Sequence, residues 1–406
     1  MVSIRIGLLL RIKAKIRACV STTKTVIIAI VCMPAIFFIR LIRPIKLIRF
    51  GYIKDFTIGH FSHDVELYLC ERDHGFLPPK SFDIFCRGPK KSIVNQQLLA
   101  MWKRILHISR VTFYLYMAND YIPGGESHRF EIHSRDVYGL LEKSKVHLSF
   151  VDDEIKEAES SKQAMGIERD KTYVCVTNRD STYKEKICPS RDWSYHDYRN
   201  DNIQNYVLAC EELTKRGHFV IRMGNVVKEV MDTSDSKIIE YAHRGYRTEL
   251  LDLYLPANCC FFISGDVGLG AMPRTFRKPI VMCNLAPIEH FLTWGSNIIS
   301  IPKRFWLKKE KKFMTFLEIF NSGAGRYLYT QKYETHGIEL IENTPEEILD
   351  VSIEMDERLK GTWFSTEEDE ELQRRFWDIF PQSELHGIMR SRVGADFLKQ
   401  NKELLY

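Results

Sequence analysis

The stretch CCFFISGDVGLGAMPRTFRKPIVMCN, residues 259–284, joins two apolar runs through a turn rich in glycine. The first run is β-prone and the second returns to apolar residues at PIVMC, so both are typical of buried strands. Gly265, Gly268 and Gly270 lack the Gly-x-Gly-x-x-Gly spacing of dinucleotide-binding proteins, and the chain has no Walker A motif. The turn is therefore either a ligand cradle or a tight connection, and the surrounding sequence has to decide between them.

Predicted strands and helices alternate on the N-terminal side of this stretch. Residues 172–180 and 218–225 have the pattern of strands, and residues 203–217 between them form an amphipathic helix closed by Gly217. Nearer the N-terminus, predicted strands and a helix occupy residues 47–53, 80–88 and 95–106, followed by a third apolar run at 111–119. Strands alternating with helices predict an α/β fold with mainly parallel sheets, in two successive Rossmann-like domains.

The length of 406 residues exceeds one ordinary hydrophobic core, which favours two domains. The polar stretch at residues 151–171 is interpreted as a surface helix and linker. Thr344 and Pro345 have the pattern of an N-cap followed by the first helical residue. The predicted organisation is a basic apolar segment at 1–47, a first Rossmann-like domain at 48–165, a second at 166–343 and C-terminal helices at 344–406.

Basic charge is concentrated at the N-terminus, where residues 1–54 contain no Asp or Glu. Lys and Arg flank the apolar run at residues 25–39, which is shorter than a spanning helix and contains Pro34. This pattern predicts a segment that lies on a membrane surface and is attracted by anionic head groups. A buried core helix and a basic tail are the alternatives, and the sequence leaves open whether residues 25–39 span the membrane.

The overall composition excludes several classes of protein. The net charge of +5 is modest and sits in an apolar segment, without the exposed basic and aromatic face of a nucleic-acid binder. The ten cysteines form no Cys-x-x-Cys pair and no zinc-ligand spacing, which favours reduced thiols and no metal site. The acidic run at residues 367–371 is interpreted as the solvated first turn of a helix.

Polar side chains and glycines follow the predicted strands, where ligands of open α/β sheets bind. These candidate residues are His60 and Asp64 in the first domain, and Asn178, Arg179, Arg222, Gly224, Ser264, Gly265, Asp266, Gly268 and Asn284 in the second. Arginine binds a diphosphate through charge-assisted hydrogen bonds, and glycine lets a ligand approach the backbone. The residue types therefore suit a nucleotide-sugar donor.

Each candidate also has a plain structural interpretation. Arg179 and Arg222 are equally suited to salt bridges with surface acids, and the glycines to the turn alone. His60 is equally suited to a helix cap or a core position. Asp266 is either the N-cap of the following helix or a contact to sugar hydroxyls, because an acid facing a diphosphate is unfavourable.

Three long segments carry a family resemblance: residues 194–225, residues 241–284 and IGHFSHDVELYL at residues 58–69. Together they resemble a family of glycosyltransferases encoded in bacterial and archaeal surface-polysaccharide gene clusters, over most of the chain from Ile48 onward. The resemblance implies a GT-B fold, with two Rossmann-like domains facing across a cleft, and a nucleotide-sugar donor. It also implies a glycan or lipid-linked glycan acceptor in polysaccharide or lipopolysaccharide biosynthesis. NRDSTY at residues 178–183 is similar to a donor-domain segment of some GT-B fucosyltransferases.

The loop YHDYRN at residues 195–200 is dense in polar and aromatic side chains, and loops carry function, so His196 and Arg199 join the donor-binding candidates. In the expected reaction His60 or Asp64 is the general base, and Arg222 with Arg179 stabilises the leaving diphosphate without a metal or cofactor. The expected location is the cytoplasmic face of the cell membrane, with peripheral or N-terminal attachment. A GT-B-type nucleotide-sugar epimerase and a non-catalytic sugar-binding protein remain alternatives.

Overall fold

In the computed structural model, the described residues are 27–406 except 29, 89–92 and 188. The chain divides into two compact units, one of residues 1–57 and 71–133 and another of residues 58–70 and 134–406. The main sheet of each unit is parallel, which confirms the predicted α/β fold. Most of the predicted basic segment lies outside the described residues.

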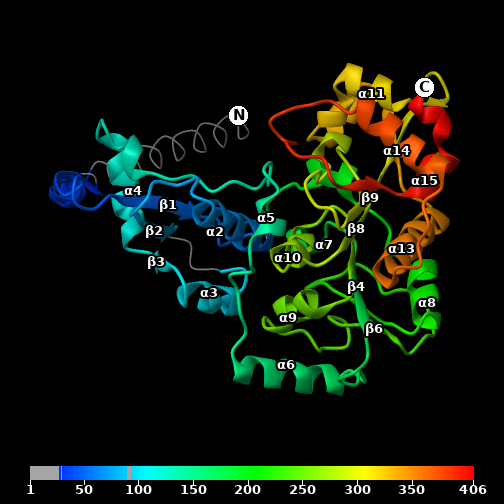
Figure 1. The fold of residues 1–406 in the computed structure, drawn as a ribbon, viewed down its shortest axis with the longest axis horizontal. Helices are drawn as coiled ribbons and strands as arrows, with labels where there is room; N and C mark the ends of the chain where they lie inside the picture. The colour runs from blue at the N-terminus through cyan, green and yellow to red at the C-terminus, as the bar shows by residue number, and fades with distance from the viewer. Residues whose placement is uncertain (1–26, 29, 89–92, 188) are drawn as a thin grey trace, which may run out of the picture. The chain divides into compact units, whose positions relative to one another are not determined.

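The first unit is built on a small parallel sheet (Figure 1). Its strands β1 (Ile48–Ile53), β2 (Phe82–Arg87) and β3 (His107–Ser109) pair in that order. Its helices are an N-terminal helix at residues 27–41 except residue 29, α3 (Gln96–Lys103) and α4 (Thr112–Tyr121). The apolar run at 111–119 is thus a helix, and the third strand is the shorter segment before it. The ring of Tyr52 on β1 packs near those of Phe113 and Tyr116 on α4, so the helix covers the sheet.

The second unit is built on a seven-stranded parallel sheet in the order β6-β5-β4-β7-β8-β9-β13. The strands are β4 (Tyr173–Thr177), β5 (Phe219–Arg222), β6 (Ile238–Glu240), β7 (Phe262–Ser264), β8 (Ile280–Leu285), β9 (Ile298–Pro302) and β13 (Arg392–Val393). Six of them repeat the strand order of a doubly wound Rossmann domain. The order reverses between β4 and β7, which are neighbours in space but not in sequence.

Helices cover both faces of this sheet. Val174 and Val176 of β4 belong to one core cluster, and Tyr173 and Cys175 belong to the other, as expected for a strand buried on both faces. The helices are α2 (Val65–Asp73), which continues into the first unit, α5 (Leu140–Lys143), α6 (Asp152–Ala164), α7 (Thr182–Ile187), α8 (Val207–Lys215), α9 (Leu251–Asn258), α10 (Ala271–Thr275), α11 (Phe316–Ser322), α12 (Thr330–Thr335), α13 (Pro345–Lys360), α14 (Glu367–Ile379) and α15 (Ala395–Gln400). A small antiparallel sheet joins β10 (Arg304–Leu307) to β11 (Lys312–Phe313) and β12 (Ile338–Ile341).

The two units do not divide the chain at the predicted boundaries of 47, 165 and 343. Residues 58–70 and 134–165 belong to the second unit. The predicted linker helix is α6, whose Ala158 is fully buried in the same core as Tyr173 of β4. The small apolar face of this helix is therefore a core contact, although most of its side chains are charged.

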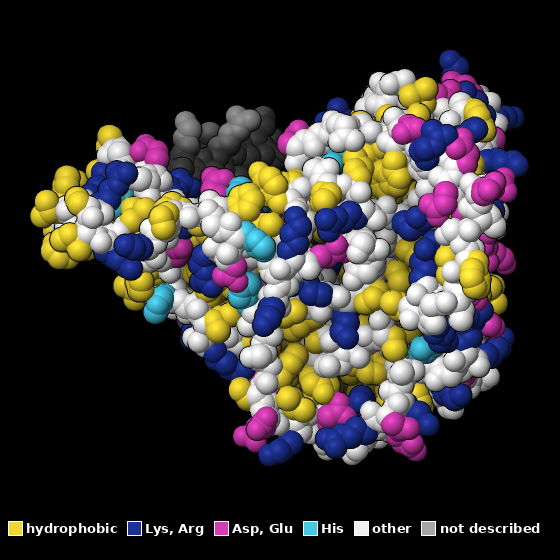
Figure 2. All heavy atoms as spheres, viewed as in Figure 1, with side chains coloured by type: hydrophobic (Ala, Val, Ile, Leu, Met, Phe, Trp, Pro, Cys, Tyr) yellow, Lys and Arg dark blue, Asp and Glu magenta, His cyan; other side chains and the backbone are white. Residues whose placement is uncertain are grey.

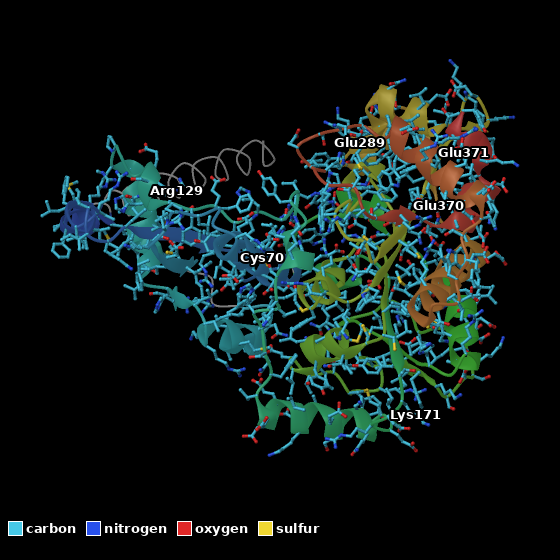
Figure 3. All side chains as sticks on the ribbon, in the orientation of Figure 1. Cys70, Arg129, Lys171, Glu289, Glu370 and Glu371 are labelled. Atoms are coloured by element: carbon cyan, nitrogen blue, oxygen red, sulfur yellow. The ribbon has the colours of Figure 1, made fainter. Side chains whose placement is uncertain are left out.

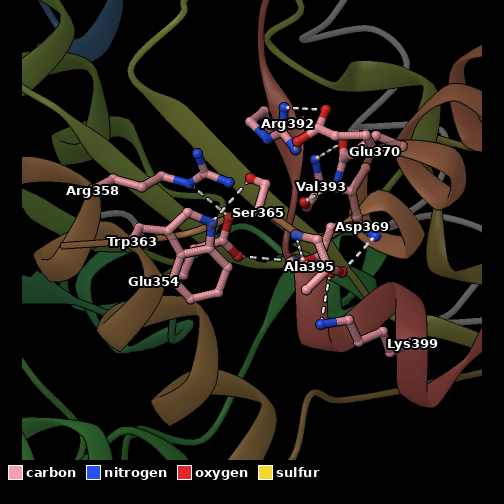
Figure 4. Close-up of polar contacts among 12 residues, drawn as sticks. Glu354, Arg358, Trp363, Ser365, Asp369, Glu370, Arg392, Val393, Ala395 and Lys399 are labelled. Carbon is pink, nitrogen blue, oxygen red and sulfur yellow. Dashed lines mark hydrogen bonds and ion pairs between the residues drawn. The ribbon is translucent and has the colours of Figure 1, made fainter. Parts of the chain in front are cut away.

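The C-terminal helices also belong to the second unit, and β13 extends its sheet. Thr344 caps α13 in a capping box with Glu347, and Pro345 takes the first turn, as the sequence predicts. The acidic first turn of α14 is only partly solvated (Figure 4). Asp369 is buried and its carboxylate lies 2.7 Å from the Lys399 ammonium, while Glu370 binds Arg392. These acids fasten α14 to α15 and β13.

Candidate functional site

The strand order of the second unit reverses between β4 and β7, and open sheets of this kind bind ligands in the crevice outside the carboxyl ends of the strands at such a reversal. Thr177 and Ser264 are the last residues of these strands and lie opposite each other. Asn178 and Arg179 follow one strand, and Gly265 and Asp266 follow the other. The two segments therefore meet across the reversal in strand order.

Asp201 lies between these two segments. Its carboxylate accepts hydrogen bonds from the Arg179 backbone N–H at 3.0 Å and from the Tyr206 hydroxyl at 3.2 Å. A Cβ atom on Gly265 would lie 2.3 Å from the same carboxylate. Burial raises the pKa of Asp201 to about 7, partly offset by the nearby Lys303. Gly265 thus makes room for a side chain of the protein itself.

Asp266 faces Arg199. The Arg199 Nε donates to the Asp266 carboxylate at 2.5 Å, and its Nη2 donates to the Asp266 carbonyl at 2.8 Å. Burial alone would raise the pKa of Asp266, but Arg199, aided by Arg179, holds it below the ordinary value. Asp266 does not cap the following helical turn, whose N-cap is Val267. Its carboxylate is committed to an arginine from the predicted polar loop.

A pocket of about 250 Å³ opens beside this cluster at the ends of β4 and β5. It is lined by Asn178, Asp180, Ser181, Asn200, Asp201, Asn202, Ile203, Arg222, Lys228, Glu229 and Glu342. Carboxylates and amides dominate this lining, and such groups accept and donate hydrogen bonds to hydroxyls. The pocket is therefore suited to a polyhydroxylated ligand.

Arg222 and Asn178 reach this pocket but are already partnered. The buried guanidinium of Arg222 lies 3.2 Å from the Glu240 carboxylate and donates to the Asn178 side chain at 3.2 Å. Glu240 is opposite Arg222 in the pairing of β5 with β6. Arg222 therefore neutralises the Glu240 carboxylate of the neighbouring strand, and part of its side chain also lines the pocket.

The other predicted donor residues have local roles. The Asn284 side chain accepts from the Asn343 backbone at 2.7 Å in a fully buried reciprocal pair. The Ser264 hydroxyl donates to the Gly265 carbonyl at 2.6 Å. Gly224 turns the chain after β5 with a φ of 159°. His196 packs its ring against Tyr195 at 4.0 Å, on the short helix that also carries Arg199.

His60 and Asp64, the two candidates for the general base, also belong to this unit. His60 Nδ1 lies 2.7 Å from the Asp64 carboxylate, which is buried while the His60 side chain is 45% exposed. Both residues are on a short π-helical segment, His60–Asp64. A Cβ atom on the preceding Gly59 would lie 3.0 Å from the Gly268 carbonyl. This close approach brings the segment against the glycine-rich turn, beside the predicted donor residues.

Sequence reasoning missed several charged residues near this turn. Arg135, Arg274 and Lys303 interact electrostatically with Asp266, and Arg179 joins them. Burial lowers the pKa of Arg135, Arg179 and Arg274 to about 10, so each remains charged at neutral pH; Arg274 also repels Arg135, and Arg199 also repels Arg179. Figure 2 shows Lys and Arg side chains gathered over α7 and α10 on this face of the unit. Each of these residues stands outside any motif, so a single sequence does not indicate that it belongs to the site.

A cluster of potential metal ligands joins two residues of α2, of which Figure 3 labels Cys70, to one residue of the segment between α5 and α6. Glu66, Cys70 and His147 bring ligand atoms within 4.8 Å of one another. The Arg277 guanidinium already contacts this cluster, with Nη2 at 2.7 Å from Glu66 and 3.4 Å from the Cys70 sulfur. The buried carboxylate is therefore neutralised by an arginine of the protein.

No family model matches the chain, and no curated protein matches it. The fold is similar to that of a glycosyltransferase family 9 protein from Veillonella parvula, with 10% identity and a TM-score of 0.44 over 77% of this chain and 97% of the other. It is also similar to E. coli ADP-heptose lipopolysaccharide heptosyltransferase II, with 11% identity and a TM-score of 0.37 over 63% and 90%. An E. coli heptosyltransferase with ADP-2-deoxy-2-fluoro heptose matches at 9% identity and 0.31, over 63% and 93%. At these values no residue role follows from the matches.

Proposed function

We propose that this protein is a glycosyltransferase that moves a sugar from a nucleotide-sugar donor to a glycan or lipid-linked glycan in surface polysaccharide biosynthesis. The observation that supports it is the carboxyl edge of the large sheet, where a polar pocket at the ends of β4 and β5 adjoins the segment of the buried Arg179, and the His60–Asp64 segment lies against the turn after β7. A nucleotide sugar offers hydroxyls and a diphosphate in one molecule. The carboxylates and amides of the pocket suit the hydroxyls, and the arginines suit the diphosphate.

The proposed chemistry uses residues of this chain. Asp64 binds His60 Nδ1 and leaves Nε2 of the exposed ring for an acceptor hydroxyl. His60 takes the hydroxyl proton while the acceptor oxygen bonds to the anomeric carbon of the sugar. The bond from that carbon to the diphosphate breaks, and the nucleoside diphosphate leaves with the electron pair. Arg179 stabilises the growing negative charge, because it is buried close to the crevice.

Donor binding can be tested without knowing the sugar. We expect nucleoside diphosphates to raise the thermal midpoint of unfolding, with a stabilisation of about 2.7 kcal/mol at a hundredfold excess over Kd. Arg179→Gln should weaken this effect, whereas Arg169→Gln, an exposed arginine outside the crevice, should not. Differential scanning fluorimetry across nucleosides, mono- and diphosphates measures the effect. If no nucleotide shifts the midpoint, the donor proposal is wrong.

The role of His60 is tested by turnover. We expect His60→Ala to lower kcat by about 10² to 10⁴ once donor and acceptor are known, with little change in donor affinity, because a general base contributes in that range. His336→Ala is the matched control, since His336 is exposed and, among the described residues, its side chain bonds only to the nearby Lys332 carbonyl.

Product analysis without acceptor separates the transferase from the epimerase, because formation of a new nucleotide sugar would favour an epimerase. Full turnover by His60→Ala would exclude the base assignment.

The proposal extends to a membrane surface. Among the described residues, no helix combines the length and apolar character needed to cross a membrane. The helix at residues 27–41 (dark blue in Figure 1) instead exposes apolar side chains to solvent, including Val31, Phe37 and Phe38 at 72, 56 and 62%. Figure 2 shows these as a group of hydrophobic side chains. Exposed Arg43 and Lys46 follow the helix, and this combination suits an anionic lipid surface.

Vesicle flotation tests this attachment. We expect the protein to float with phosphatidylglycerol vesicles, and the double substitution Phe37→Asp and Phe38→Asp to reduce binding at least tenfold, because each buried phenylalanine contributes about 1.5–3 kcal/mol. Phe364→Asp is the control, since Phe364 is 86% exposed in the second unit. Equal flotation of the double variant would show that residues 27–41 do not hold the protein to lipid.

A further inference from the structure

Arg274 on α10 is a partly buried arginine without a partner among the described residues. Its side chain makes no ion pair or hydrogen bond there, and its Nε is buried and unpaired. The two carboxylates that attract it are both committed elsewhere. Asp64 binds His60 at 2.7 Å, and Asp266 binds Arg199 at 2.5 Å. A charged guanidinium held in this way lacks the compensation that buried charges normally have.

Arg135 approaches the same place from the loop before α5. Among the described residues its guanidinium donates only to backbone carbonyls, those of Leu385, His290 and Phe291 at 2.8, 3.2 and 2.6 Å, and it lies over the Trp294 ring. These contacts fix its position without neutralising its charge. Arg135 and Arg274 repel each other, and each is attracted by Asp266. Two fixed cations that repel each other are a preorganised site for an anion.

We infer that Arg274 and Arg135 form an anion site that binds a phosphoryl group of a pyrophosphate-bearing ligand. With Arg179 across Asp266, the cations are suited to two adjacent phosphoryl groups rather than one. Arg274 also interacts with Asp64, so a ligand bound there lies near the His60–Asp64 pair. The identification of that ligand as the donor rests on the proposed function, whereas pyrophosphate binding itself does not.

The test uses the full chain with inorganic pyrophosphate as the probe. We expect pyrophosphate to bind the unmodified protein by calorimetry and to raise its thermal midpoint. Arg274→Gln should weaken binding at least tenfold, since a charge-assisted contact is lost. The same variant should leave the midpoint without ligand unchanged or higher, because it removes an unpaired charge. Arg374→Gln, an exposed arginine on α14, should bind pyrophosphate normally.

Two results would overturn the inference. One is a pyrophosphate affinity of Arg274→Gln within twofold of the unmodified protein. The other is a fall of several degrees in its ligand-free midpoint, which would assign Arg274 a purely structural role. Failure of the anion site can be distinguished from failure of the proposed function. Pyrophosphate binding that depends on Arg274, without any nucleotide-sugar turnover, leaves the anion site standing and the transferase proposal wrong. Nucleotide binding that does not depend on Arg274 would show the anion site to be wrong and leave the transferase proposal standing.

Discussion

Replacing Gly265 by alanine is expected to lower the free energy of unfolding of the second unit by about 3 kcal/mol. The added Cβ would lie 2.3 Å from the Asp201 carboxylate and 3.3 Å from the Arg179 backbone nitrogen. Asp201 is buried and holds the Arg179 N–H and the Tyr206 hydroxyl. It cannot move away without losing those hydrogen bonds, so the change costs both overpacking and unsatisfied donors. Thermal unfolding followed by circular dichroism measures the loss.

The same turn supplies the control. A Cβ on Gly268 would have its nearest neighbours at 3.8 Å or more, and this residue is exposed, so Gly268→Ala should change stability by less than about 0.5 kcal/mol. The cause can be isolated with Asp201→Ala. In that background Gly265→Ala should cost much less, because the clashing carboxylate is gone. Equal costs for Gly265→Ala and Gly268→Ala would show that Asp201 does not occupy this space.

The glycine-rich turn shows what one sequence could and could not predict. Alternating apolar and amphipathic segments predict the parallel sheet, because that pattern depends on local burial. The meeting of residues 178–179 with residues 265–266 also follows from strand order. The reason for Gly265 does not follow, because Asp201 arrives from a loop with no repeated pattern. The sequence interpretation assigned that space to a ligand, and the protein's own carboxylate fills it.

Arginines were the least predictable part of the site. Arg222 is a donor candidate because it ends a strand, but its pairing with Glu240 depends on strand register across a crossover. Arg135 and Arg274 follow no strand and belong to no motif, and they reach Asp266 only through tertiary packing. A positive charge can be read from the sequence, but whether a neighbour neutralises it cannot. The roles of Arg222 and the other predicted donor residues therefore remain predictions.

Removing the Glu66 carboxylate is expected to destabilise the second unit by about 3–5 kcal/mol, the cost of breaking a buried ion pair. Glu66 is fully buried on α2, and one of its oxygens accepts from Arg277 at 2.7 Å and from His147 at 3.1 and 3.2 Å. Glu66→Ala would leave the Arg277 guanidinium without a carboxylate. Calorimetric unfolding of the full chain, with the transition of the second unit resolved, measures the change.

The size of this effect can be traced to the uncompensated charge. Asp153→Asn removes an acid of an ion pair whose carboxylate side chain is 94% exposed, so it should cost less than about 1 kcal/mol. Arg277→Gln added to Glu66→Ala should recover part of the loss, because no charge is then left unpaired. Glu66 also holds α2, which continues the segment carrying His60 and Asp64, against the turn after α10. Glu66→Ala should therefore also weaken the proposed glycosyl transfer, even where the protein remains folded. A loss of stability as small as that of Asp153→Asn would mean that the carbonyls that Arg277 already binds compensate its charge.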